Sequence, residues 1–231
     1  MTDDTNAVDG TAWGHWVRAG HERWEVVRRS WTVYFRNSHE LIRLLQIPAR
    51  NLGVSLQLMG DDRDATAPYW EELDQRLHNL LASAVSLVDH TRRLLTYYEP
   101  DIPTFVAEYN RRNIAVTDMN ETSFLRDLRN YLLHYGEPPL VQTMDLAPTT
   151  GTEGTGHSIK LSAARLLEWD KWRAQSRRYL SSFDDRDGPV LATDVVAYAN
   201  AMSALFSWLF EQRQAVNSDE NVLDRFRIGG S

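Results

Sequence analysis

An apolar stripe at helical spacing, running from Tyr69 to Tyr98, constrains the fold of this chain more than any other feature. Its members follow one another at intervals of four and three residues, which places them on one side of a single long helix. They are Tyr69, Leu73, Leu77, Leu80, Ala84, Leu87, Thr91, Leu94 and Tyr98. Pro68 marks the expected start of this helix and Pro100 follows its expected end. Because a helix with one apolar side needs apolar partners, the stripe predicts a helical bundle.

A second stripe, rich in tryptophan, predicts another long helix over residues 13–45, and Pro48 follows its expected end. The members of this stripe lie close to one helical face. They are Trp13, Trp16, Gly20, Trp24, Val27, Trp31, Tyr34 and Leu41. Such a face is typical of a side that packs into the core, and a subunit interface is the alternative. Two shorter helices are expected after the 68–98 helix, one from Pro103 to about Ile114 and one over residues 122–135.

The pattern changes after Pro139. Residues 140–146 and 157–161 are short β-compatible runs around a loop rich in Pro, Thr, Gly and Glu, which predicts a β-hairpin. Ser162 is the expected cap of a helix that continues to about Phe183, and a last helix runs from about Asp194 to Val216. The predicted fold class is mainly α: a helical bundle with long antiparallel helices and a small β-hairpin inserted at 139–161. We expect one domain over residues 1–231, with loose tails at 1–12 and 217–231.

Composition limits the class of protein. A length of 231 residues with 42% hydrophobic and 10% aromatic residues is ample for a sizeable core and excludes a disordered chain. The absence of cysteine excludes disulfides and thiolate metal sites. No stretch approaches the length of an apolar membrane span, and the acidic N-terminus lacks the features of a secretory signal, so we expect a cytoplasmic protein that does not contact membranes.

Charge and motif content narrow the function. The net charge of −7 disfavours a general nucleic-acid binder, but residues 76–135 hold seven Arg against seven acidic residues, which leaves room for a local basic cleft. The sequence lacks the P-loop, dinucleotide-binding and nucleophile-elbow motifs. Its histidines also lack the spacings of zinc sites, so we expect neither a metal nor a cofactor.

The strongest candidate site is the helix FLRDLRNYLLHY at residues 124–135, which carries Arg129, Asn130 and His134. Arginine binds phosphate at any accessible pH, and histidine exchanges protons near neutrality, so the segment holds the groups needed for metal-free phosphodiester chemistry. Asp118 with Glu121 has the spacing of a capping box, and Gly136 is the expected left-handed end. At roughly 100° and 1.5 Å per residue, Arg129 and His134 lie about 140° apart around the axis with a rise near 7.5 Å. Either a long arginine side chain that reaches around the helix, or a second copy of the helix from another subunit, would bring the two groups together.

The run Arg129-Asn130-Tyr-Leu-Leu-His134 resembles the Arg-(polar)-x-x-x-His motif of the HEPN superfamily. The wider segment LRDLRNYLLHYGEPP is similar to a group of uncharacterised bacterial HEPN-like proteins, over about fifteen residues. This resemblance implies a helical bundle that dimerises and so brings two motifs together. Many members of the superfamily are metal-independent endoribonucleases, so the resemblance also implies this activity. Other members keep the fold without demonstrated catalysis.

Four residues are auxiliary candidates. His90 and Arg93, on the 68–98 helix, have the chemistry of an auxiliary acid/base and a phosphate contact, although such groups more often form a solvated helix face. Arg126 adds a cation one turn before Arg129, and Tyr135 has a ring that is able to stack on a base. The structural alternatives are a buried salt bridge for Arg129, and a helix-dipole contact for His134.

The sequence therefore predicts a homodimeric, metal-independent endoribonuclease that acts on RNA, in phage defence or in a toxin–antitoxin system with an antitoxin or other partner protein. Arg129, Asn130 and His134 are the predicted catalytic residues. The alternative is a catalytically silent helical module that dimerises or binds a partner protein or a nucleotide.

Overall fold

The computed structural model describes residues 10–144 and 156–217, and these residues form a mainly helical fold with one small antiparallel sheet. The fold class predicted from the sequence is confirmed. The elements are α1 (Gly10–Arg50), α2 (Leu52–Met59), α3 (Arg63–Tyr98), α4 (Pro103–Thr117), α5 (Asn120–His134), β1 (Leu140–Met144), β2 (His157–Leu161), α6 (Ala163–Leu167), α7 (Ala174–Leu180) and α8 (Leu191–Asn217).

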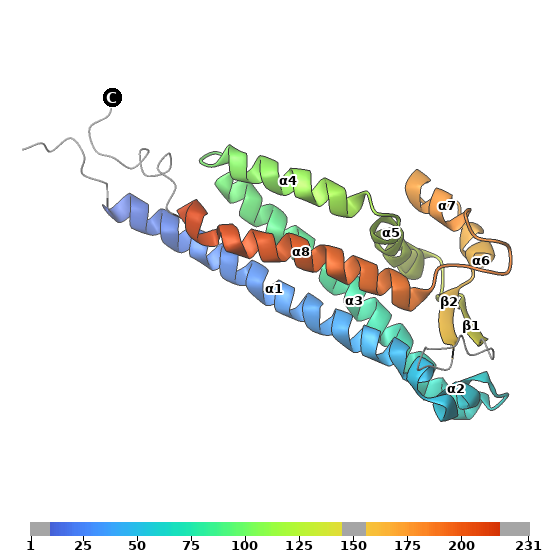
Figure 1. The fold of residues 1–231 in the computed structure, drawn as a ribbon. Helices are drawn as coiled ribbons and strands as arrows, with labels where there is room; N and C mark the ends of the chain where they lie inside the picture. The colour runs from blue at the N-terminus through green and yellow to red at the C-terminus, as the bar shows by residue number, and fades with distance from the viewer. Residues whose placement is uncertain (1–9, 145–155, 218–231) are drawn as a thin grey trace, which may run out of the picture.

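The long helices α1, α3 and α8 form the body of the molecule, and α1 packs against both α3 and α8 and runs antiparallel to each of them (Figure 1). Helix α4 packs against α3 and α8, and α5 crosses the bundle where it contacts α3, α4, α7 and α8. The hairpin pairs Leu140 with Leu161 and Met144 with His157. It lies with α6 and α7 at one end of the bundle (Figure 1). Helix α5 therefore joins α7 to the bundle, and β2 packs directly against α1 and α8.

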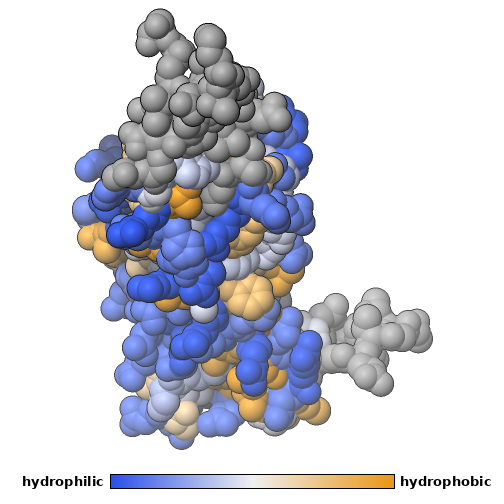
Figure 2. All heavy atoms as spheres, turned by 90° about the vertical axis from the view of Figure 1, so that its left-hand side faces the viewer, coloured by the Kyte–Doolittle hydropathy of each residue, from blue (hydrophilic) through white to orange (hydrophobic). Residues whose placement is uncertain are grey.

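The predicted stripes on α1 and α3 are buried against each other. Trp24 and Tyr98 are fully buried, and the indole Nε1 of Trp24 donates a hydrogen bond to the Tyr98 hydroxyl at 3.1 Å. Gly20 lies directly beside this pair. A Cβ added at that position would come within 2.4 Å of the same hydroxyl oxygen. The core interpretation of the tryptophan-rich stripe is therefore confirmed. The face of the molecule in Figure 2 is mainly hydrophilic, with separate hydrophobic patches between the polar side chains.

Two of the prolines expected to bound helices, Pro48 and Pro68, lie inside them, whereas Pro103 begins α4 as predicted. Helix α1 continues through Pro48 to Arg50. Helix α3 begins five residues before Pro68, because the Asp62 side chain accepts a hydrogen bond from the Ala65 amide and caps the earlier start. A further helix, α2, which the sequence pattern did not predict, follows α1, and Asn51 caps it.

The prediction of one long helix over 162–183 is wrong, because the structure has two short helices there. Ser162 caps α6 as predicted, but the chain leaves the helix before Trp169 and resumes it at Ala174. The break turns Trp172 into the core, where its indole donates to the Leu166 carbonyl oxygen at 2.6 Å. Burial of two tryptophan rings (Trp169 and Trp172) outweighs continuation of the helix here.

The predicted ends of α5 are also corrected. Met119 occupies the N-cap position and makes no side-chain cap bond, so the capping box of Asp118 and Glu121 is not formed. Tyr135 closes the helix with φ −123°, and among the described glycines only Gly156 has a positive φ. Gly136 is therefore not the left-handed residue that the sequence predicted. The tails 1–9 and 218–231 lie outside the described residues, whereas residues 10–12 belong to α1.

Candidate functional site

The inner side of α5 fixes the position of the candidate site. Phe124 and Tyr131 stack on Trp172 at ring-centroid distances of 5.8 and 5.7 Å. The buried carboxylate of Asp127 accepts hydrogen bonds from the Ser176 hydroxyl at 2.7 Å and from the Arg173 amide at 3.3 Å. These contacts tie α5 to the start of α7, so the outer side of α5 is held in one orientation.

The three motif residues all lie on the outer side of α5. Arg129 and Asn130 are half-buried, and His134 is exposed. At about 100° per residue, Leu133, Arg126 and Asn130 fall between Arg129 and His134 around the helix. Within residues 10–144 and 156–217, none of the three motif side chains has a hydrogen bond or an ion pair. The salt bridge proposed as the structural alternative for Arg129 is thus not formed with any described carboxylate.

Arg129 borders a pocket of about 430 Å³ between α3, α4, α5 and α8. Arg92, Arg126 and Arg173 also line this pocket. Partial burial, followed by repulsion from Arg173, lowers the pKa of Arg126 below its ordinary value. Several arginines therefore converge on one hollow beside the motif, which favours an anionic occupant.

His134 is not part of this pocket, whose lining does not extend to the last turn of α5. The structure therefore keeps Arg129 and His134 on different sides of the outward face, as the helical spacing predicted. A site that uses both groups would need either the long Arg129 side chain to reach around α5 or a second copy of α5.

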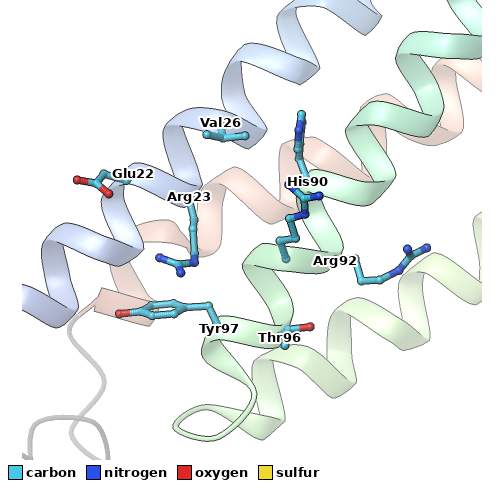
Figure 3. A pocket seen from close by; sticks show the side chains of 8 residues that line it. Glu22, Arg23, Val26, His90, Arg92, Thr96 and Tyr97 are labelled. Atoms are coloured by element: carbon cyan, nitrogen blue, oxygen red, sulfur yellow. The ribbon is translucent and has the colours of Figure 1, made fainter.

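The auxiliary candidates His90 and Arg93 lie elsewhere, in a groove of about 770 Å³ between α1 and α3 (Figure 3). His90 Nδ1 is 2.6 Å from the Ser30 hydroxyl, and the guanidinium of Arg23 lies 4.2 Å above the ring of Tyr97. The structure does not bring His90 or Arg93 to the motif on α5.

Arg92 connects the two hollows, because it lines both the groove between α1 and α3 and the pocket beside Arg129. In Figure 3 its side chain points from α3 away from α1. It forms an ion pair with Asp89 at 2.9 Å. Together the two hollows place basic side chains on both flanks of α3.

Tyr135, the remaining auxiliary candidate, is 50% exposed and does not complete the buried stripe of α5. Its ring lies 5.1 Å from that of Tyr131, in a tilted arrangement. The outer face of the ring is accessible at the same end of the helix as His134.

Sequence reasoning missed Arg173 and Thr122 as members of the pocket. Arg173 reaches it because its Nε lies 3.5 Å from Asp127 Oδ1, an ion pair across 46 residues of sequence. Thr122 has the residue type of a helix cap, and instead it is buried in the first turn of α5 with its side chain at the pocket. Neither contact has a local sequence signal, because both depend on how α5 packs.

No three His, Asp or Glu side chains in the described ranges gather closely enough to hold a metal ion. The helices in those ranges all lack an apolar stretch sufficient to span a lipid bilayer. Comparisons of the chain with protein-family models, with curated proteins and with solved structures found no match.

Proposed function

We propose that this protein is a metal-independent endoribonuclease whose active site is completed by homodimerisation along α5. The observation that carries the proposal is the outward face of α5, where Arg129, Asn130 and His134 all lie without a partner among the described residues. A second α5 related by a twofold axis would set Arg129 of one chain beside His134 of the other. The resemblance to the HEPN motif supports the same assignment.

The chemistry assigned to the site is transesterification of RNA. His134 accepts the proton of a ribose 2′-hydroxyl as that oxygen attacks the adjacent phosphorus, and the bond from phosphorus to the 5′-oxygen breaks. The imidazolium formed at His134 then passes a proton through a water molecule to the departing 5′-oxygen, and the products are a 2′,3′-cyclic phosphate and a free 5′-hydroxyl. Arg129 stabilises the charge on the pentacoordinate phosphorus, and Asn130 orients the imidazole or binds a phosphate oxygen.

The charges around the motif support a polyanionic substrate. Although the chain carries a net charge of −7, Arg126, Arg129 and Arg173 gather beside the motif, and Arg23, Arg92 and Arg93 line the groove across α3. Local positive potential of this kind attracts a phosphate backbone even on an acidic protein. Arg126 would contact a flanking phosphate, and Tyr135 would stack on a base.

The first prediction concerns RNA cleavage by full-length variants, with EDTA present throughout. His134→Ala and Arg129→Ala should each lower the cleavage rate on the order of 10²–10⁴-fold, as expected for loss of a general acid/base and of a charge stabiliser. Both variants should keep the melting temperature and dimer of the wild type, because neither side chain is buried. His39→Ala and Arg36→Ala remove exposed residues of the same types from α1 and should leave cleavage unchanged.

Stable, dimeric His134→Ala and Arg129→Ala proteins with wild-type cleavage would refute the catalytic assignment. Complete loss of wild-type cleavage in EDTA, with recovery on adding magnesium, would refute the metal-independent mechanism. The cellular setting that fits such an enzyme is phage defence or a toxin–antitoxin pair in the cytoplasm, with an antitoxin as partner.

A catalytically silent dimerisation module is the second candidate. Leu133 is 52% exposed in the middle of the motif face, and an exposed leucine there suits a protein–protein contact. In this case the wild-type protein dimerises through α5 but cleaves no RNA, and Arg129 serves the interface. The cleavage assay separates the two candidates directly.

A further inference from the structure

The pocket between α3, α4, α5 and α8 has largely aliphatic walls. The aliphatic residues that line it come from all four helices and are Leu81, Ala84, Val85, Val88, Val116, Leu125 and Met202. Tyr198 is the one aromatic residue among the described residues of the lining. Pockets that read nucleobases use aromatic or guanidinium planes for stacking, whereas walls of this composition suit an aliphatic group.

The polar part of the same pocket is strongly basic. Four arginines line it against one carboxylate, that of Asp89, among the described residues. Arg92 is neutralised by Asp89 and Arg173 lies against Asp127, but Arg126 and Arg129 form no ion pair in the described part of the chain. The mutual repulsion of Arg126 and Arg173 would be relieved by an oxyanion held between them.

A polar atom also lies unpaired at the pocket. Thr122 is 5% exposed, and its hydroxyl is buried without a hydrogen-bond partner among the described residues. Buried polar groups are nearly always paired, so an unpaired hydroxyl on a residue that lines the pocket is unusual.

We propose that this pocket binds a small amphipathic anion, with an aliphatic body against α3, α4 and α8 and a carboxylate or phosphate head held by Arg126 and Arg173. Its volume of about 430 Å³ lies within the range of small-molecule sites. The proposal goes beyond RNA cleavage and does not depend on it. Arg126 and Arg129 border both sites, so the variants that test the pocket leave the catalytic Arg129 intact and are judged by ligand affinity alone.

The test is isothermal titration calorimetry of the full-length protein with octanoate and with octyl phosphate, which share the tail and differ in the head. At least one of the two should bind saturably with a stoichiometry of one per chain. Inorganic phosphate, which lacks the tail, and 1-octanol, which lacks the charge, should bind at least about tenfold more weakly than that ligand. AMP, with an aromatic body of the same charge type as octyl phosphate, should also bind more weakly.

Two pocket variants and one control complete the test. Val85→Trp fills the pocket from α3 and should abolish binding, and Arg126→Gln should weaken it about tenfold or more, as expected for a lost charge-assisted contact. Arg36→Gln removes the same charge from the exposed side of α1 and should leave binding unchanged.

Arg126 is exposed enough that its replacement leaves a folded protein, so the test does not depend on Val85→Trp alone. The proposal is overturned if neither amphiphile binds, if inorganic phosphate or 1-octanol binds as tightly as the amphiphiles, or if Arg126→Gln has no effect on their affinity. If AMP binds more tightly than octyl phosphate, the pocket binds a nucleotide and the proposal of an aliphatic ligand is wrong. None of these outcomes bears on RNA cleavage, which the His134 and Arg129 variants report.

Discussion

At the scale of single residues, the partners of each arginine separate structural from candidate functional groups. Arg76 pairs with both Glu40 and Glu72 and so joins α1 to α3. Arg112 pairs with Glu108 on its own helix and lies 4.7 Å from the ring of Trp208. The interactions of these arginines within the bundle account for their positions. Arg126 and Arg129 have no such contacts in the described ranges, and this difference is the reason to assign them to ligands.

Asp194 provides a prediction of pH dependence. Its carboxyl is buried in the first turn of α8 and accepts hydrogen bonds from Tyr179 at 2.9 and 3.1 Å. Burial raises the pKa of Asp194 from 3.8 to about 7, although the Tyr179 bond opposes the shift. The folded protein therefore binds more protons than the unfolded chain between about pH 4 and pH 7, so this group makes stability fall as pH rises through that window.

Asp194→Asn stays neutral and keeps an acceptor for Tyr179, so it should remove this contribution. The free energy of unfolding of the variant, relative to that of the wild type, should increase from pH 4 to pH 7.5 by on the order of 1–3 kcal/mol, since one pKa unit corresponds to about 1.4 kcal/mol. Urea denaturation at several pH values measures the difference. Parallel pH profiles for the two proteins would contradict the shift.

At the scale of elements, close contact between α1 and α3 depends on a glycine. Gly20→Ala would place a methyl group against the buried Tyr98 hydroxyl, which is held by Trp24, so the variant should lose about 1–3 kcal/mol of stability. Gly14 lies on the same helix, and a methyl group added there would meet open space, so Gly14→Ala should gain about 0.5–1 kcal/mol from helix propensity. Thermal denaturation of the two variants should show shifts of opposite sign. Equal effects would indicate that the helices can separate at Gly20 without cost.

Helices with one apolar side could be predicted from sequence, because burial acts on each turn in the same way. The stripes on α1 and α3 and the presence of the hairpin follow from such local patterns. The break between α6 and α7 could not be predicted, because Trp169 and Trp172 fit a helical period but are buried through contacts with Tyr131.

One part of the candidate site could be predicted from sequence, and another part could not. The outward position of Arg129, Asn130 and His134 follows from the period of α5 and could be predicted from sequence. The pocket could not, because Arg173 reaches it only through the carboxylate of Asp127, an arrangement set by the packing of α5 on α7. Long-range packing of this kind has no trace in a local residue pattern.

At the scale of the whole molecule, the proposed function requires a second chain. Leu133 lies at the centre of the motif face, so Leu133→Asp should split the dimer and lower RNA cleavage at least about tenfold, although all three motif residues remain. Leu56→Asp, at a 56% exposed position on α2, is the matched control and should leave both properties unchanged. Light scattering and the cleavage assay report the two effects. A fully active Leu133→Asp monomer would show that one chain suffices.

Complementation between inactive variants tests how the two chains share the site. If each site takes Arg129 from one chain and His134 from the other, a dimer of one Arg129→Ala chain and one His134→Ala chain has one intact site and one site that lacks both groups. Random mixing of equal amounts gives roughly half mixed dimers, so about a quarter of the wild-type activity should return. Each variant alone should stay inactive, because all its sites lack the same group. If both groups of a site come from one chain, mixing restores nothing, because every site in every dimer then lacks either Arg129 or His134.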